Sequence, residues 1–417
     1  MFEKFFDPSP RGQARVRSLR NSPHGLLLEG FSRELFHSRY ANITARRLIR
    51  SAEHFIAVAT DNSIPVLRWD SRALESFYRH LSRRRCSYGH NEPESQVACA
   101  RLFLRYLRTS SAVRTPLCDP IPVPAPLVAF RRWMREERGT CDATLGNYDT
   151  PIRELLNSLG EDPERFHAAS LRRCFVQYCA GRGHVAIKHG ATALRMFLRF
   201  LITEGKCPAG LEAAIPLVPH WRLSSLPRYL QPDEVERILA SCDSSSSVGK
   251  RDRAILLLLA RLGLRAGDIV QLHLRDIDWK DAWVRVCGKG GRQTRLPLTQ
   301  EVGDAIVDYL QDGRPQTDDG RVFVCCRAPF RSLGSYCAVS ARVAQAIRRA
   351  GVTLPSRGAA HLLRHSVATS LLRHGASLQD IATLLRHRSI QTTQIYAKVD
   401  VLSLSQIAQP WPEVRSC

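Results

Sequence analysis

A cluster of prolines constrains this chain most, because it interrupts any helix or sheet that would otherwise run through it. Five prolines fall within eleven residues: Pro116, Pro120, Pro122, Pro124 and Pro126. Proline fixes φ and has no backbone N–H, so this segment cannot be a helix or a central strand. It predicts a semi-rigid, extended spacer. A second stretch over 215–228, rich in proline and serine, predicts another linker.

The two linkers predict three domains. An N-terminal helical domain would span 1–118, a second helical domain 128–215 and a third domain 229–417, with linkers at 119–127 and 216–228. A chain of 417 residues suits about three domains of ~150 residues. The segments 101–107 and 195–201 are nearly alike and have helical periodicity, which indicates two copies of a small helical module. Chance similarity between two amphipathic helices is the alternative.

The third domain has a mixed pattern, and the predicted fold class is mainly α with a small antiparallel β-sheet. Two short strands are predicted over 283–287 and 292–298, joined by a glycine-rich turn over 288–291. A buried helix over 255–262 is stopped by Gly263. Further helices are predicted over 340–349, 361–374 and 377–386, and around Tyr396.

The charge of the chain points to nucleic acid as its partner. The net charge is +22 and the pI is about 10.0, and a large basic protein most often meets a polyanion. The longest apolar run, 255–260, is far shorter than the ~20 residues that span a bilayer, so no membrane role is expected. The 13 cysteines are scattered without Cys-x-x-Cys pairs, which suggests reduced thiols in a cytosolic protein.

Six side chains in the last third supply the groups needed to attack a phosphodiester without a metal. In chain order they are Arg265, Lys289, His361, Arg364, His387 and Tyr396. Each alone has an ordinary structural explanation, such as a solvated lysine in a turn or a packed tyrosine. Together, arginine forks can neutralise non-bridging oxygens and a tyrosine can act as the nucleophile. A lysine and a histidine can transfer the protons.

The motifs around these residues resemble those of the tyrosine recombinases, the phage integrase family, over about 125–410. They read Leu-Gly-Leu-Arg265, Gly-Lys289-Gly-Gly-Arg-x-x-Arg-Leu-Pro-Leu, His361-x-x-Arg364 and Leu-x-His387-x-Ser-Ile-x-Thr-Thr-x-x-Tyr396. The resemblance implies a SAM-like helical core-binding domain followed by a catalytic domain. It also implies a site-specific recombinase or integrase that cuts and rejoins duplex DNA, for integration, excision or transposition of a mobile element.

The resemblance also assigns the roles of the six residues. Tyr396 would form a 3′-phosphotyrosyl bond, Arg265 and Arg364 would hold the phosphate, and Lys289 would protonate the leaving 5′ oxygen. His361 would accept a proton or a hydrogen bond, and His387 would contact the phosphate. Asp268 stands where the family usually has an acid that orients the active-site arginine. Because the phosphotyrosyl bond conserves the energy of the broken bond, no ATP, metal or other cofactor is expected.

One position departs from the resemblance: the family usually has glycine before the second active-site histidine, and this chain has Arg386. Arg386 would either crowd the loop and displace His387 or add a contact to the DNA backbone. The candidate DNA contacts are Arg131, Arg132, Lys188, Arg195, Arg199, Arg292, Arg386 and Arg388. A solvated basic face is the alternative for each of them.

The resemblance further implies partners and a location. Double-stranded DNA would be clamped between the core-binding and catalytic domains, and a homotetramer would form during synapsis. Residues 1–118 would bind arm-type or flanking DNA or a partner recombinase, and the tail 401–417 would dock on a neighbouring subunit or on its own domain. Accessory DNA-bending proteins are further candidates. The location would be the bacterial cytoplasm, at the nucleoid.

Two other functions fit the same residues. A type IB topoisomerase shares this chemistry but acts on any duplex, whereas a recombinase acts on a defined site and two partner duplexes. A non-catalytic DNA-binding protein could keep the fold, and Arg386 would then be a sign of decay. The presence of all six residues argues against the second alternative.

Overall fold

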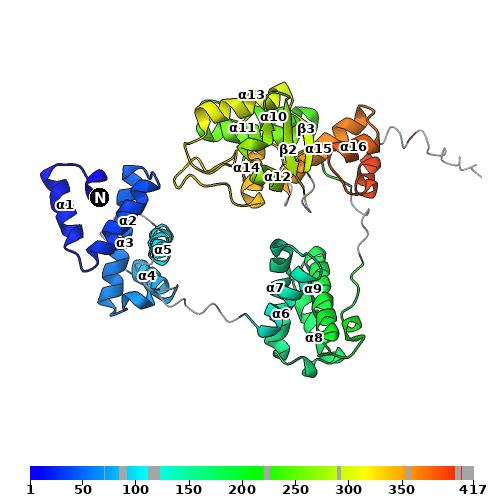
Figure 1. Cartoon of the computed structure of the whole chain (residues 1–417), viewed down its shortest axis with the longest axis horizontal. Helices are drawn as coiled ribbons and strands as arrows, with labels where there is room; N and C mark the ends of the chain where they lie inside the picture. Colours follow the sequence, from blue (N-terminus) through cyan, green and yellow to red (C-terminus); the bar gives the residue numbers. More distant parts are fainter. Residues whose placement is uncertain are drawn as a thin grey trace, which may run out of the picture. The chain divides into compact units, whose positions relative to one another are not determined.

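The computed structural model describes residues 1–69, 71–83, 92–110, 123–219, 226–288, 293–353, 358–399 and 405. The chain forms two compact units (Figure 1): Thr115–Ser224 is one, and Met1–Arg114 together with Ser225–Cys417 is the other. Much of the proline-rich spacer, the hairpin turn and almost all of the tail lie outside the described residues. The division into three domains therefore stays a prediction.

The N-terminal segment is helical, as its periodicity predicts. Its helices are α1 (Pro10–Arg20), α2 (Gly25–His37), α3 (Asn42–Asp61), α4 (Ser71–Arg83) and α5 (Pro93–Thr109), with 3₁₀ turns at Phe2–Lys4 and Val66–Arg68. Their inner faces share a hydrophobic core rich in aromatic rings. Phe31, Phe55 and Phe103 are almost fully buried there, together with Trp69. This segment therefore has enough apolar surface for a core of its own.

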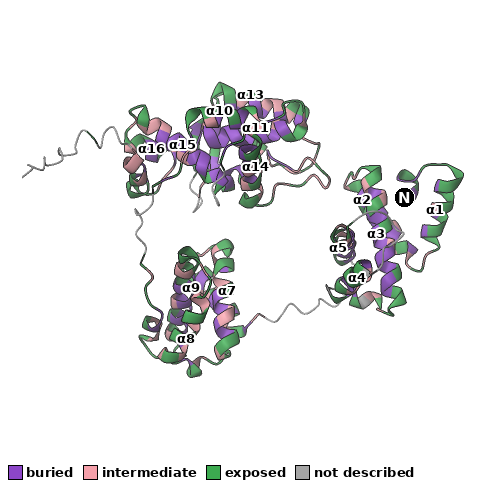
Figure 2. Ribbon diagram, turned by 180° about the vertical axis from the view of Figure 1, so that it is seen from behind, coloured by how far each residue is buried: buried purple, intermediate pink, exposed green. Residues whose placement is uncertain are grey.

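The unit Thr115–Ser224 is a second group of helices. It contains α6 (Ala125–Glu136), α7 (Asp142–Leu159), α8 (Ala168–Cys179) and α9 (His184–Thr203), with 3₁₀ turns at Pro163–Arg165 and Leu211–Ala214. Phe130 of α6 packs edge-on against Phe197 of α9, with ring centroids 5.5 Å apart. Figure 2 shows the buried faces of these helices turned toward one another and the exposed faces turned to solvent.

The segment from residue 226 onward is mixed. Its helices are α10 (Pro232–Ala240), α11 (Ser247–Ala260), α12 (Ala266–Gln271), α13 (Gln300–Asp308), α14 (Tyr336–Arg349), α15 (Ala359–Arg373) and α16 (Leu378–Leu384). Shorter turns lie at Leu274–Asp276, Tyr309–Gly313, Ile390–Thr392 and Gln394–Val399. Helix α11 packs against α10, α13, α14 and α15, and its residues Ala254 to Leu259 are at most 1% exposed. No helix in the described part of the chain is long and apolar enough to cross a membrane.

The sheet has three antiparallel strands in the order β1 (Ile277–Asp278), β2 (Trp283–Cys287) and β3 (Gln293–Pro297). Val284 of β2 pairs with Leu296 of β3, and both side chains are buried. The predicted strand at 283–287 is confirmed, and the strand predicted at 292–298 is observed at Gln293–Pro297. Strand β1 was not predicted, because two residues carry no period-2 pattern.

Local capping explains where the helices differ from the predictions. Helix α11 begins at Ser247 and not at 255, because the hydroxyl of Ser246 accepts the N–H of Gly249 at 3.1 Å and caps the helix. Helix α14 likewise begins at Tyr336, where Ser335 caps it, and not at 340. Tyr396 lies in a 3₁₀ turn rather than an α-helix.

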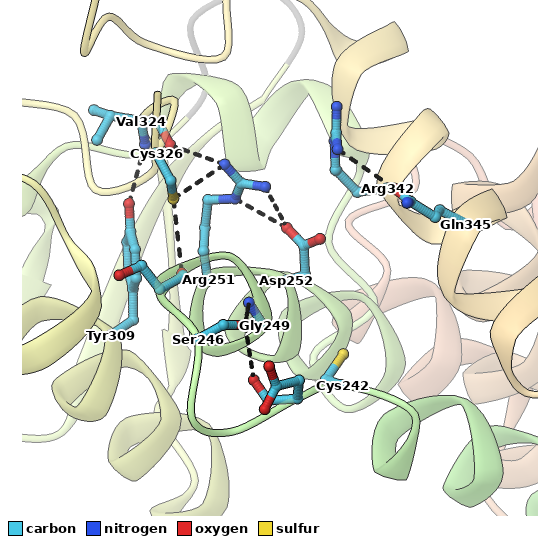
Figure 3. A network of polar contacts seen from close by, with 12 residues as sticks. Cys242, Ser246, Gly249, Arg251, Asp252, Tyr309, Val324, Cys326, Arg342 and Gln345 are labelled. Carbon is cyan, nitrogen blue, oxygen red and sulfur yellow. Dashed lines mark hydrogen bonds and ion pairs between the residues drawn. The ribbon is translucent and has the colours of Figure 1, made fainter. Parts of the chain in front are cut away.

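Arg251, which forms a buried ion pair within α11, also ties this helix to the loop over 320–332 (Figure 3). The guanidinium of Arg251 donates to Asp252 Oδ1 from Nε and Nη2, at 2.9 and 2.7 Å. Its Nη1 reaches the carbonyl of Val324 and the sulfur of Cys326, each at 3.3 Å. Tyr309 accepts the N–H of Val324 through its hydroxyl at 3.3 Å. Asp252 therefore fixes the direction of the Arg251 guanidinium, and the bonds to Val324 and Cys326 hold the loop in place.

Two features of the structure favour glycine at position 263, three residues after the end of α11. Its φ is +58°, in the left-handed region. A Cβ added there would lie 2.7 Å from Leu385 Cδ2, and Leu385 is fully buried. This close approach brings the start of α12 next to the end of α16.

We expect Gly263→Ala to destabilise the protein more than Gly375→Ala. Both glycines have positive φ, but a Cβ at Gly375 meets nothing within 4 Å. The left-handed conformation alone costs roughly 1–2 kcal/mol for a residue other than glycine. The contact with Leu385 adds about 1–3 kcal/mol of overpacking at position 263. Urea unfolding followed by far-UV circular dichroism measures both, and equal losses at the two positions would contradict the close approach.

Candidate active site

The two predicted phosphate-binding arginines come from different elements and meet at the end of α16. Arg265 precedes α12 and is half-buried, whereas Arg364 on α15 is 4% exposed. Arg364 donates from Nη1 to the carbonyl of Gly263 and from Nη2 to that of Leu385. Arg265 donates from Nη2 to the carbonyls of Leu385 and Arg386, at 3.5 and 3.3 Å. One short loop therefore orients both guanidinium groups.

These hydrogen bonds hold the two arginines without neutralising them. Among the described residues, neither Arg265 nor Arg364 forms an ion pair with a carboxylate. Burial lowers the pKa of Arg364 to about 9, and the charges of Arg265 and Arg386 act in the same direction. Burial is also the main reason for the lowered pKa of Arg265. A site that destabilises its own cations in this way favours binding of an anion.

The phenol of Tyr396 lies near the two arginines, whose charges act on it. Its side chain is 1% exposed, and its hydroxyl is 2.8 Å from Nδ1 of His365. Burial raises the pKa of Tyr396 to about 12, while the charges of Arg364 and Arg265 oppose that rise. The predicted nucleophile is therefore close enough to the two predicted phosphate-binding arginines to interact with them electrostatically. Its hydrogen-bond partner, His365, lies 31 residues away in the sequence.

His365 was not among the predicted site residues. Burial lowers its pKa to about 4, and the neighbouring His361 and Arg364 add to the shift. The imidazole is therefore neutral at neutral pH, and with its proton on Nε2 the Nδ1 atom accepts the phenol hydrogen. The sequence contains one signal that was not used: His365 stands four residues after His361, on the same face of a helix.

His361 and His387 lie near the two arginines from different sides. Desolvation lowers the pKa of the His361 imidazole, followed by the charges of Arg364 and Arg265. Burial lowers the pKa of His387 to about 4, again with Arg364 and Arg265 contributing. Nδ1 of His387 is 2.8 Å from the hydroxyl of the buried Thr393. Both histidines are therefore neutral hydrogen-bonding groups near neutral pH.

Asp268 has a different partner from the one expected. Its Oδ2 accepts the backbone N–H of Arg265 at 2.8 Å, and it pairs with Nη2 of Arg386 at 2.6 Å. It therefore fixes the main chain of Arg265, and its ion pair is with Arg386 instead of the Arg265 guanidinium.

The side chain of Arg386 is 7% exposed and paired with Asp268, and its contact with the DNA backbone stays a prediction. The charges of Arg364 and Arg265 still act on His387, so Arg386 leaves this histidine near the two arginines. The other DNA-contact candidates differ in their surroundings. Arg131 is paired with Asp149, and Arg195 donates to the carbonyl of Ile215 at 2.7 Å, so the structure gives both intramolecular partners that the sequence did not suggest. Lys188 is half-buried, and three remain exposed: Arg132, Arg199 and Arg388. Lys289 and Arg292 lie outside the described residues.

Comparison with known proteins identifies the family. Residues 228–402 match the phage integrase family. The y4rA protein of Sinorhizobium fredii, whose name describes it as an integrase/recombinase, is 39% identical over 323 residues. That match covers 76% of this chain and 78% of the relative. The chain belongs to the phage integrase family of tyrosine recombinases.

Other similarities agree with this assignment. Tyrosine recombinase XerD of Listeria innocua is 30% identical over 232 residues, which cover 54% of this chain and 76% of the relative. The XerH recombinase in a post-cleavage complex with its palindromic difH substrate has a TM-score of 0.53 at 17% identity, over 80% of this chain and 93% of that one. The lambda integrase tetramer on a Holliday junction has a TM-score of 0.51 at 19% identity, over 74% and 88%.

These structures share the fold of the recombinase and confirm the predicted class, mainly helical with a small antiparallel sheet. The region that matches the family contains all six predicted active-site residues, together with His365 and Arg386. As a tyrosine recombinase, the protein is an enzyme of DNA recombination. Five of the six predicted side chains lie around Arg265 and Arg364. The sixth, Lys289, is outside the described residues.

The stability of the recombinase should fall between about pH 6.5 and about pH 5. The pKa values of His365 and His387 are both lowered to about 4, from ordinary values near 6.5. In this window the unfolded chain therefore binds more protons than the folded one, and the free energy of unfolding decreases as the pH falls. Each histidine contributes at most about 1.4 kcal/mol per pH unit.

Thermal unfolding at about pH 7.5 and about pH 5 measures this effect. The double variant His365→Asn, His387→Asn should show a smaller drop in melting temperature than the parent. The variant His374→Asn, at an exposed position, serves as the control. An unchanged drop in the double variant would mean that other groups cause the acid sensitivity.

Proposed function

We propose that this recombinase cuts and rejoins duplex DNA at a specific site through a 3′-phosphotyrosyl intermediate. The observation that carries the proposal is the position of the Tyr396 hydroxyl, which is hydrogen-bonded to a neutral imidazole and influenced by the charges of the buried Arg364 and the half-buried Arg265. Such a group becomes a nucleophile once a phosphate binds to the arginines and the imidazole takes the phenol proton. No step in this scheme uses a metal or ATP.

The proposed step balances as follows. The Tyr396 oxygen bonds to phosphorus, the bond to the 5′ oxygen breaks, and the phenol proton passes to Nδ1 of His365. Lys289 donates a proton to the leaving 5′ oxygen, a role that rests on the family resemblance alone. Arg265 and Arg364 hold the non-bridging oxygens, since carbonyls orient both groups and leave their charge for the phosphate. His361 and His387 add hydrogen bonds to the same phosphate.

The burial of Tyr396 adds a condition to this mechanism. A phenol that is 1% exposed cannot meet a DNA phosphate unless the turn Gln394–Val399 moves. We infer that binding of DNA, or of a neighbouring subunit, shifts this turn. The arginines remain anchored meanwhile, because their partners are carbonyls in the loops that follow α11 and α16.

Duplex DNA is the proposed substrate, and the proposed assembly is a homotetramer around two sites. The net charge of +22 supports the first part. The relatives named above as DNA complexes, one of them a tetramer on a Holliday junction, support both parts. The exposed Arg132, Arg199 and Arg388 are proposed phosphate contacts.

The proposed biological role is integration, excision or transposition of a mobile element on bacterial nucleoid DNA in the cytoplasm. The helices of residues 1–110 are proposed to bind flanking DNA or a partner recombinase. Accessory DNA-bending proteins are proposed as further partners. The DNA that flanks the gene is therefore the first substrate to test.

Tyr396→Phe should abolish covalent attachment to DNA and leave DNA binding intact, because only the nucleophilic oxygen is lost. A pool of nicked suicide duplexes covering the DNA that flanks the gene supplies the substrate, and a denaturing gel detects the adduct. Tyr336→Phe is the matched control, because Tyr336 is exposed on α14. An adduct formed by the Tyr396→Phe protein would refute the nucleophile. Relaxation of plasmids that lack any such site would favour a topoisomerase.

His365→Asn should slow adduct formation by roughly 10²–10⁴-fold, the usual contribution of general-base catalysis. The asparagine oxygen can still accept the phenol hydrogen bond but cannot take its proton. The parent rate should be flat between about pH 6 and about pH 9, whereas the variant rate should rise about ten-fold per pH unit. That rise follows from a phenol whose pKa is about 12, since only the phenolate then reacts. A flat profile and the parent rate in the variant would limit His365 to packing.

A further inference from the structure

Arg386 occupies a backbone position that favours glycine. It follows Leu385, the C-cap of α16, and its φ is +54°. The N–H of His387 donates to the carbonyl of Ala382 at 2.9 Å, and the N–H of Arg386 donates to that of Thr383 at 3.0 Å. These two bonds form a Schellman motif, whose left-handed residue is most often glycine. An arginine at this position is strained, so other interactions must hold it there.

The interaction that holds it is a buried ion pair with the helix beside the site. Nη2 of Arg386 lies 2.6 Å from Oδ2 of Asp268, and each side chain is 7% exposed. The same carboxylate oxygen accepts the backbone N–H of Arg265 at 2.8 Å. The carbonyl of Arg386 in turn accepts Nη2 of Arg265 at 3.3 Å. Asp268, Arg386 and Arg265 therefore form a closed ring of contacts.

Stability alone does not explain this arginine. Its Nε and Nη1 atoms are buried and have no hydrogen-bond partner within the described part of the chain. Its positive charge also lowers the pKa values of Arg364 and Arg265. Glycine would avoid the left-handed strain, the unsatisfied donors and the repulsion. A residue that is unfavourable in three ways and still has a largely buried side chain suggests a role in the site.

We propose that Arg386 is a positioning residue that occupies the Asp268 carboxylate and so leaves the Arg265 guanidinium free for the scissile phosphate. The charge of Asp268 acts on Arg265 as well as on Arg386. If Arg386 is absent, the carboxylate attracts the Arg265 guanidinium and competes with the phosphate for it. The Arg386 carbonyl meanwhile accepts a hydrogen bond from the Arg265 guanidinium, and the Schellman motif fixes the backbone of His387. This inference rests on the proposed function of the site.

The test compares Arg386→Gly, Arg386→Lys and Asp268→Asn with the double variant Asp268→Asn, Arg386→Gly. The rate of adduct formation at saturating DNA should fall at least about ten-fold in Arg386→Gly, a loss confined to transition-state stabilisation. The melting temperature, measured on the same samples, separates a loss of rate from a loss of folding. Arg386→Lys keeps the charge and should recover part of the rate. In the Arg386→Gly background, Asp268→Asn should recover most of the lost rate, because the competing carboxylate is gone; when Arg386 is present it should lower the rate, because Arg386 loses its partner.

Arg39→Gly is the matched control. Arg39 has a φ of +57° at the end of α2, and the bonds from Tyr40 N–H to Leu35 O and from Arg39 N–H to Phe36 O form the same motif. The side chain of Arg39 is exposed. This substitution removes the same strain and charge outside the site, so the melting temperature should stay the same or rise and the adduct rate should not change.

The outcomes separate this inference from the proposed function. If the parent forms the adduct and Arg386→Gly reacts within about two-fold of it, the inference is overturned and the function stands. Independent, multiplicative effects of the Asp268 and Arg386 substitutions would also overturn it. If the parent forms no adduct on any duplex, the function fails. Hydrogen exchange at the backbone N–H groups of Arg265 and His387 then still tests the ring of contacts, which predicts faster exchange in Arg386→Gly but not in Arg39→Gly.

Discussion

Main-chain carbonyls, and not carboxylates, hold the two central arginines of this recombinase. Gly263, Leu385 and Arg386 provide these carbonyls, and all three lie in loops that end a helix. A carbonyl dipole fixes the direction of a guanidinium without cancelling its charge. The elements around the site serve this arrangement: Gly263 allows the close approach, and the buried α11 and α15 keep both loops in place.

The same arrangement makes the site unfavourable when it holds no anion. Of its three guanidinium groups, only that of Arg386 pairs with a carboxylate among the described residues. The pKa values of His365 and His387 are lowered to about 4. A protein selected for stability alone would not keep so much uncompensated charge in a buried place. A bound phosphodiester would supply the missing negative charge. The cost of the empty site and the affinity for DNA therefore have the same physical origin.

Much of this protein was predictable because its signals are local. The stop at Gly263, the strand at 283–287 and the helices around 340–349 and 361–374 follow from short-range periodicity and turn chemistry. The six predicted active-site residues followed from their order and spacing. Helix starts were placed less well, since a single serine cap at Ser246 or Ser335 outweighs the apolar pattern. The two-residue strand β1 has too little pattern to be seen.

The sequence by itself determined the helical class, the basic charge and the order of the chemical groups, because each of these depends on composition or on neighbours a few residues apart. Only the tertiary structure decided which groups touch. His365 meets Tyr396 across 31 residues, and Arg386 meets Asp268 across 118. The pattern of a chain does not encode such pairs, because they depend on how α12, α15 and α16 pack. That packing made Arg386, a predicted DNA contact, a largely buried partner of Asp268.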